Sequence, residues 1–105
     1  MVKTEMEFLE DNPDIERIHV AAQSTRLHIL NLLTKNSKMY ASKLGELLNT
    51  ERKVIAFHLN ALEKAGLVIS EFGLSEDERP VAVRYYKMTP KGKEILRKLV
   101  SIIER

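Results

Sequence analysis

Residues 41–66 read ASKLGELLNTERKVIAFHLNALEKAG and carry two apolar stripes at helical spacing. The stripe of the first segment consists of Ala41, Leu44, Leu47 and Leu48, and that of the second consists of Ile55, His58, Leu59 and Leu62. Asn49 lies between them, where a residue that tolerates the left-handed conformation ends a helix, and Thr50 is a candidate cap for the next helix. Because two stripes so close in sequence must pack against each other, the stretch predicts a helix-turn-helix over residues 41–65.

Two more helices are predicted before this motif. Asn12 and Pro13 mark the start of the first, because Asn caps helices and Pro suits the first helical position. Ser24 is the candidate cap of the second, whose pattern ends at Asn36. The stripe of the first helix consists of Ile15, Ile18 and Ala22, and the apolar residues of the second are Leu27, Ile29, Leu30, Leu32 and Leu33. Since the second helix is apolar on so much of its circumference, we expect it to be buried at the centre. Residues 38–40 are long enough only for a short strand.

The periodicity changes after Gly66, where a left-handed residue would end the second helix of the motif. Residues 67–72 and 81–87 form two β runs, separated by GLSEDERP, which is rich in turn formers and charge. We expect a two-stranded hairpin with a long polar tip, a wing, over residues 67–88. Thr89 and Pro90 then repeat the signal of a cap followed by proline. A terminal helix is predicted over residues 90–105 from the apolar residues Ile95, Leu96, Leu99, Ile102 and Ile103.

This order of elements predicts an α+β fold that is mostly helical, a winged helix-turn-helix with a two-stranded β wing and a C-terminal dimerisation helix. The chain of 105 residues is long enough for one domain, which we place at residues 13–105 after an acidic arm at residues 1–12. The terminal stripe runs beyond what a small core covers, which favours a partner chain. The alternative is that this helix folds back onto its own domain.

The composition limits the classes of function. Hydrophobic residues make up 44% of the chain and charged residues 30%, no apolar run approaches the ~20 residues of a membrane helix, and the acidic N-terminus lacks the pattern of an export signal. We therefore expect a cytoplasmic protein. The absence of cysteine excludes disulfides and thiolate chemistry.

The charges are distributed unevenly along the chain. Residues 1–20 hold six acidic and two basic residues, a net charge of −4, whereas residues 21–105 hold nine acidic and fifteen basic residues, a net charge of +6. The basic part contains the helix-turn-helix, which favours nucleic acid as a partner.

Three segments resemble known regulators of transcription. AAQSTRLHILNLL, residues 21–33, resembles the opening of ArsR/SmtB-type regulators, and VIAFHLNALEKAGLV, residues 54–68, is similar to their recognition helix and its exit. YYKMTPKGKEIL, residues 85–96, is more similar to the end of the wing in MarR-like winged-helix regulators. The resemblance implies a homodimeric transcription factor that binds a roughly palindromic operator in double-stranded DNA.

The chain departs from the metal-sensing members of that family. Tyr40 and Ser42 occupy the places of their Cys-x-Cys pair, and residues 90–105 contain Glu94 and Glu104 but no histidine. We therefore expect no metal site and no cofactor. Nothing in the residues demands a small-molecule effector, although MarR-like proteins bind such molecules.

A step of 100° per residue defines the expected outer side of the recognition helix. With the apolar stripe turned inward, Lys53, Phe57, Asn60 and Lys64 point outward, and Arg52 and Ala56 lie on the flank. Arginine and lysine can donate to guanine, asparagine can pair with adenine, and an aromatic ring can lie on a thymine methyl group. The expected DNA-binding residues on this helix are Arg52, Lys53, Ala56, Phe57 and Asn60. Lys43 and Thr50 are expected to anchor the DNA backbone, and Arg79 and Arg84 are expected to contact DNA from the wing. The expected dimer interface comprises Ile15, Ile18, Ile95, Leu99, Ile102 and Ile103.

Other interpretations remain open at this point. The cations could be solvated surface charges, and His58 fits a packing role better than a base-reading one. The acidic run Glu76, Asp77 and Glu78 at the wing tip argues against DNA contact there and is compatible with a winged-helix protein-interaction module. An enzyme is not expected, because no phosphate-binding loop, nucleophile elbow or paired metal motif is present.

Overall fold

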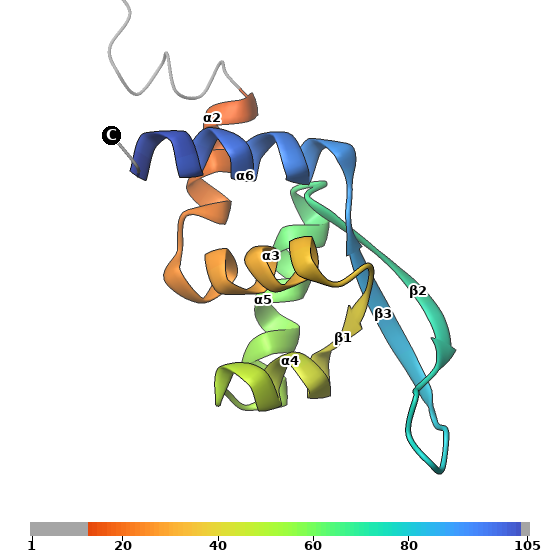
Figure 1. The fold of residues 1–105 in the computed structure, drawn as a ribbon. Coiled ribbons are helices and arrows are strands. Elements are labelled where there is room, and N and C mark those ends of the chain that lie inside the picture. Colours follow the sequence, from red (N-terminus) through yellow and green to blue (C-terminus); the bar gives the residue numbers. More distant parts are fainter. Residues whose placement is uncertain (1–12, 104–105) are drawn as a thin grey trace, which may run out of the picture.

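The computed structural model describes residues 13–103 and shows five helices and a three-stranded antiparallel sheet in that range (Figure 1). The helices are α2 (Pro13–Ala21), α3 (Ser24–Lys35), α4 (Ala41–Leu48), α5 (Arg52–Lys64) and α6 (Pro90–Ile103), and the strands are β1 (Met39–Tyr40), β2 (Val68–Leu74) and β3 (Ala82–Met88). The predicted α+β winged helix-turn-helix is confirmed. The predicted acidic arm, residues 1–12, and the last two residues of the predicted terminal helix lie outside the described residues.

The sheet is the wing with one short strand added. Its order is β1-β3-β2, and β2 pairs with β3 from Val68 opposite Met88 to Leu74 opposite Ala82. The hairpin extends away from the helices, and its tip lies at the same end of the molecule as α4 (Figure 1). α2 and α6 cross at the opposite end (Figure 1). The two β runs expected from the sequence thus form the wing, with β2 extending to Leu74.

The core lies where α3, α5 and the base of the hairpin meet. Ile29 and Leu30 of α3 are fully buried, as are Ile55 and Leu59 of α5. Val68, Tyr86 and Met88 at the base of the hairpin close the same cluster. The expectation of a buried central helix is therefore correct, and α3 supports the recognition helix from behind.

Four local assignments from the sequence are wrong. Ser24 is not a cap, because it is already the first residue of α3 and follows an extended Gln23. Thr50 does not cap α5 either, since its hydroxyl donates to the carbonyl oxygen of Leu48 at 3.0 Å and Glu51 occupies the cap position. Leu47 is 54% exposed, which removes it from the buried stripe of α4. In α2, Ala21 is buried instead of Ala22.

The start of α6 is fixed to the exit of α5. Thr89 caps α6, because its hydroxyl accepts a hydrogen bond from the amide of Gly92 at 3.0 Å. The same hydroxyl donates to the carbonyl oxygen of Gly66 at 2.6 Å, and the Thr89 amide donates to the carbonyl oxygen of Leu67 at 3.1 Å. Gly66 has φ of +77°, a conformation that favours glycine. At Gly92, a Cβ atom would collide with the Leu67 carbonyl.

The variant Gly92→Ala tests this junction. The collision is with backbone, so we expect a loss of about 1–3 kcal/mol in the free energy of unfolding. This exceeds the roughly 0.5–1 kcal/mol that alanine gains over glycine inside a helix. Urea denaturation of Gly92→Ala beside the exposed neighbour variant Lys93→Ala, expected within about 0.5 kcal/mol of wild type, measures the effect. An unchanged or higher midpoint for Gly92→Ala would show that α6 does not pack on Leu67.

Candidate nucleic-acid interface

The two sides of α5 have opposite character. Ile55, Leu59 and Leu62 are completely buried, and His58 beside them is 6% exposed. Phe57 is 65% exposed. Arg52, Lys53 and Asn60 are exposed as well, and Ala56 is half-buried at the flank. The orientation of the helix predicted from its periodicity is therefore confirmed.

His58 holds α5 against the helices behind it. The Nε atom of Arg26 donates to Nδ1 of His58 at 3.1 Å, and an Arg26 terminal nitrogen donates to the carbonyl oxygen of Val20 at 3.0 Å. Burial, and then the nearby guanidinium, lower the pKa of His58. His58 is thus a neutral packing and hydrogen-bonding residue. Arg26 belongs to the segment that resembles the ArsR/SmtB-type regulators, but its contact with His58 was not predicted, because one arginine in an apolar helix does not reveal its partner.

The turn before α5 brings α4 close to it. Asn49 has φ of 50° and ψ of 47°, the left-handed conformation expected at this position. The Thr50 amide donates to the Gly45 carbonyl oxygen at 2.9 Å, and a Cβ atom on Gly45 would lie 2.7 Å from the Thr50 carbonyl oxygen. Only glycine fits here without a shift of the backbone. Lys43 lies exposed on α4, and its Nζ atom is 3.7 Å from a carboxylate oxygen of Glu46.

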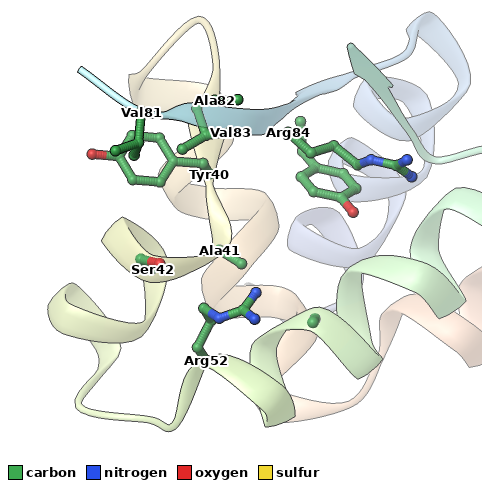
Figure 2. A pocket seen from close by; sticks show the side chains of 10 residues that line it. Tyr40, Ala41, Ser42, Arg52, Val81, Ala82, Val83 and Arg84 are labelled. Atoms are coloured by element: carbon green, nitrogen blue, oxygen red, sulfur yellow. The ribbon is translucent and has the colours of Figure 1, made fainter. Parts of the chain in front are cut away.

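A cleft of about 520 Å³ separates the helix-turn-helix from the wing. One wall carries Tyr40, Ala41 and Ser42 from β1 and the start of α4, together with Arg52 and Ala56 of α5, and the other is formed by residues 81–84 and Tyr86. Figure 2 shows the Arg52 side chain rising from the start of α5 toward the strand that carries Arg84. Of the predicted DNA-binding residues, Arg52, Ala56 and Arg84 thus meet at one cleft. Its residues Tyr40, Ser42 and Tyr86 were not predicted, because only the fold brings them together.

The wing separates its charges by face. Successive strand residues point to opposite faces. Arg84 lines the cleft, whereas Tyr85 lines a hollow of about 300 Å³ together with Lys38, Glu76 and Asp77. Burial, followed by the charge of Asp77, raises the pKa of Tyr40 at the edge of that hollow. Glu76 and Asp77 thus line this hollow and not the cleft, while Tyr40 borders both and Lys43 also lines the hollow. Arg79 is exposed in the loop between Asp77 and β3.

The predicted dimer residues divide into two groups at the opposite end of the molecule. Ile95 is fully buried and Leu99 is 6% exposed, both in the chain's own core, so assigning their side chains to an interface is not supported. They are covered because α6 packs on α2 and α3. Ile102 and Ile103 are 59% and 65% exposed. Ile15 and Ile18 of α2 are half-buried.

Residues 13–103 contain neither a metal-binding cluster nor a membrane-spanning helix. No three histidine, aspartate or glutamate side chains of that range come together as a metal site would require. None of its helices is both long and apolar enough to cross a membrane.

The chain was compared with known proteins. The family model described as bacterial regulatory protein, arsR family, matches residues 23–70, which include α3, α4 and α5. No curated protein matches the chain. A solved structure described as a possible transcriptional regulator for arsenical resistance is 32% identical, with a TM-score of 0.62 over 83% of this chain and 82% of that one.

Two further solved structures support the fold. The transcriptional repressor PagR of Bacillus anthracis is 23% identical, with a TM-score of 0.66 over 90% of this chain and 99% of that one. A regulator of the MarR family from Enterococcus faecalis V583 is 19% identical, with a TM-score of 0.70 over 99% of this chain and 86% of that one. At these identities the likeness concerns the winged-helix architecture alone.

His58 gives a test of how α5 is held. A folded-state pKa below the ordinary value of ~6.5 means that the unfolded chain binds more protons near and below that pH. The free energy of unfolding should therefore fall as the pH drops through this window. In His58→Gln, the amide oxygen can still accept a hydrogen bond from Arg26, but the part of the pH dependence that comes from His58 should be absent. Urea denaturation of both proteins at about pH 7.5 and about pH 5.5 measures it, and equal pH dependence in the two would contradict the neutral, buried state of His58.

Proposed function

Because the chain belongs to the arsR family of bacterial regulatory proteins, we propose that it regulates transcription as a homodimer that binds specific sites in double-stranded DNA. The observation that carries this proposal is the outer face of α5. It presents two cations, Arg52 and Lys53, and an aromatic ring, Phe57, next to a cleft that the wing borders. Cations and an exposed ring at the start of a recognition helix suit base edges in the major groove.

The cations near this face are available for a ligand. Within residues 13–103, no ion pair or hydrogen bond engages the side chains of Arg52, Lys53, Arg79 or Arg84. At the opposite end, Lys91 and Lys98 each contact the carboxylates of Asp14 and Glu94 at 3.1–3.4 Å. Release of counterions from DNA would favour binding at the end that carries these four unpaired cations.

We assign a role to each predicted residue in this arrangement. Arg52 and Lys53 enter the major groove with Phe57 and Ala56 against apolar base edges, and Asn60 lies one turn farther along the exposed side. Lys43 and Thr50 at the edge of the motif suit the sugar-phosphate backbone. Arg84 borders the cleft, and Arg79 lies in the wing loop. Glu76 and Asp77 of the acidic tip line the hollow that contains Lys43 and not the cleft of Arg52 and Arg84, so their repulsion of phosphate would act beside Lys43.

The second part of the proposal is a dimer formed at the end away from the wing tip. Ile102 and Ile103 expose apolar side chains on the last turn of α6. Beside them, a groove between α2 and α6 is lined by Ile18 and Ile102 together with Glu94, Arg97, Lys98 and Ser101. A second copy of the chain would cover these residues and place two recognition helices about one turn of DNA apart, ~34 Å. A dimer that occupies a promoter blocks polymerase without further contacts, so we favour repression.

The variant Arg52→Ala with Lys53→Ala tests the DNA-binding face. Each good contact to a base contributes about 1–3 kcal/mol, so we expect affinity for genomic fragments selected by the wild-type protein to fall at least tenfold. Both side chains are exposed, and the fold should persist. A mobility-shift assay measures the affinity, and Lys35→Ala with Lys93→Ala, which removes the same charge elsewhere, is the matched control. Equal affinity of the two variants would refute the assignment of α5.

The variant Ile102→Asp with Ile103→Asp tests the dimer. Two carboxylates on the apolar surface would have to be desolvated in the interface, so the variant should sediment as a monomer where the wild type sediments as a dimer. Ile69→Asp, also at a half-exposed isoleucine but on β2, should leave the dimer intact. Sedimentation equilibrium distinguishes these outcomes. A monomeric wild type, or a dimeric double variant, would contradict this interface.

A further inference from the structure

We propose that Phe72 is a positioning residue for DNA binding, whose ring holds the guanidinium of Arg84 at the rim of the cleft, ready to donate to a phosphate of the DNA backbone. The inference rests on the proposed function and adds a residue that neither the recognition helix nor the sequence pattern indicated. It starts from the pairing of β2 with β3.

Phe72 and Arg84 face each other across the wing. The register places Phe72 directly opposite Arg84, so their side chains project from the same face of the hairpin. Ala82 and Tyr86 share that face with Arg84 by alternation, and all three line the cleft. The guanidinium carbon of Arg84 lies 4.7 Å from the centre of the Phe72 ring. This distance is within the range of a cation–π contact.

The exposure of Phe72 argues against a role in the core. Its side chain is 75% exposed, more than any other large hydrophobic residue among those described. A ring so exposed contributes little to the hydrophobic core, and single exposed apolar residues are common on protein surfaces. What distinguishes Phe72 is the cation above its ring. The ring therefore acts on Arg84 and not on the packing of the domain.

The geometry suits a phosphate ligand. A guanidinium that lies on a ring uses its face and leaves its N–H donors free at the edge, where they can bind phosphate in pairs. An arginine side chain otherwise loses rotamer freedom when it is fixed, and a ring that restricts it beforehand lowers this loss on binding. Arg52 borders the same cleft from α5. A DNA strand beside the major groove would thus pass between two arginines.

A double-mutant cycle in DNA affinity tests the proposal. The four proteins are the wild type, Phe72→Leu, Arg84→Ala and the double variant, and Phe72→Leu is chosen because it keeps an apolar side chain but removes the ring face. Phe72→Leu should weaken binding to genomic fragments selected by the wild type about 2- to 5-fold, the range of an exposed cation–π contact. In the Arg84→Ala background the same change should have no effect. Phe72→Trp, in contrast to Phe72→Leu, should bind with at least wild-type affinity, because tryptophan is the best ring for a cation.

The controls separate this proposal from its alternatives. Thermal unfolding midpoints of all variants should match, since both side chains are exposed. Arg84→Ala should lower the slope of log affinity against log salt by about 1, as expected for one phosphate contact. Additive effects of the two changes, or a Phe72→Leu protein with wild-type affinity, would overturn the role of Phe72 while leaving DNA binding in place. If the wild type binds no duplex DNA at low salt, both this inference and the proposed function fail.

Discussion

The burial of one side of α5 is the constraint on which the rest of the structure depends. Three aliphatic side chains, Ile55, Leu59 and Leu62, are completely removed from solvent, and each contributes roughly 1.5–3 kcal/mol by burial. Rotating the helix by one residue, 100°, would expose them and turn Lys53 or Phe57 toward the core. The hydrophobic effect therefore decides which side chains the helix presents outward, and the polar face follows from it.

Hydrogen bonds to the backbone extend this constraint to the other end of the molecule. The carbonyl oxygens at the exit of α5 accept hydrogen bonds from two other elements. Arg17 of α2 donates to the Ala65 carbonyl oxygen at 3.2 Å, and Thr89, before α6, donates to that of Gly66 at 2.6 Å. The end that we propose for dimerisation is thus joined to the recognition helix by polar contacts as well as by the core. The spacing of two recognition helices in a dimer depends on this junction.

The sequence predicted much of this arrangement, and its errors have physical causes. Helical periodicity located α5 and its two faces because burial on one side is a strong and local signal, and Asn49 and Gly66 marked turns that need left-handed residues. The caps were misplaced, because Ser24 is already the first residue of α3 and the Thr50 hydroxyl bonds the Leu48 carbonyl oxygen, which a sequence does not distinguish from capping. Ile95 and Leu99 share a stripe with Ile102 and Ile103, but only the packing of α6 shows where the core ends.

Contacts across the fold were beyond the sequence. Tyr40, Ser42 and Tyr86 meet at the cleft because β1 pairs with β3, and the pairing of Phe72 with Arg84 depends on the hairpin register. Glu76 and Asp77 line the hollow of Tyr85 and not the cleft of Arg84, which their position in the sequence does not reveal. These contacts depend on which strands pair and in which register, and the sequence composition does not determine that.

The central claim is that α5 and the cleft beside it form the DNA-binding face. A nuclear magnetic resonance titration of the labelled protein with a short duplex at low ionic strength tests it most directly, because every backbone amide reports separately. We expect the largest changes at Arg52 to Phe57, at the start of α4 and in β3 near Arg84, with little change along the exposed side of α6. Changes confined to α2 and α6, with α5 silent, would contradict it.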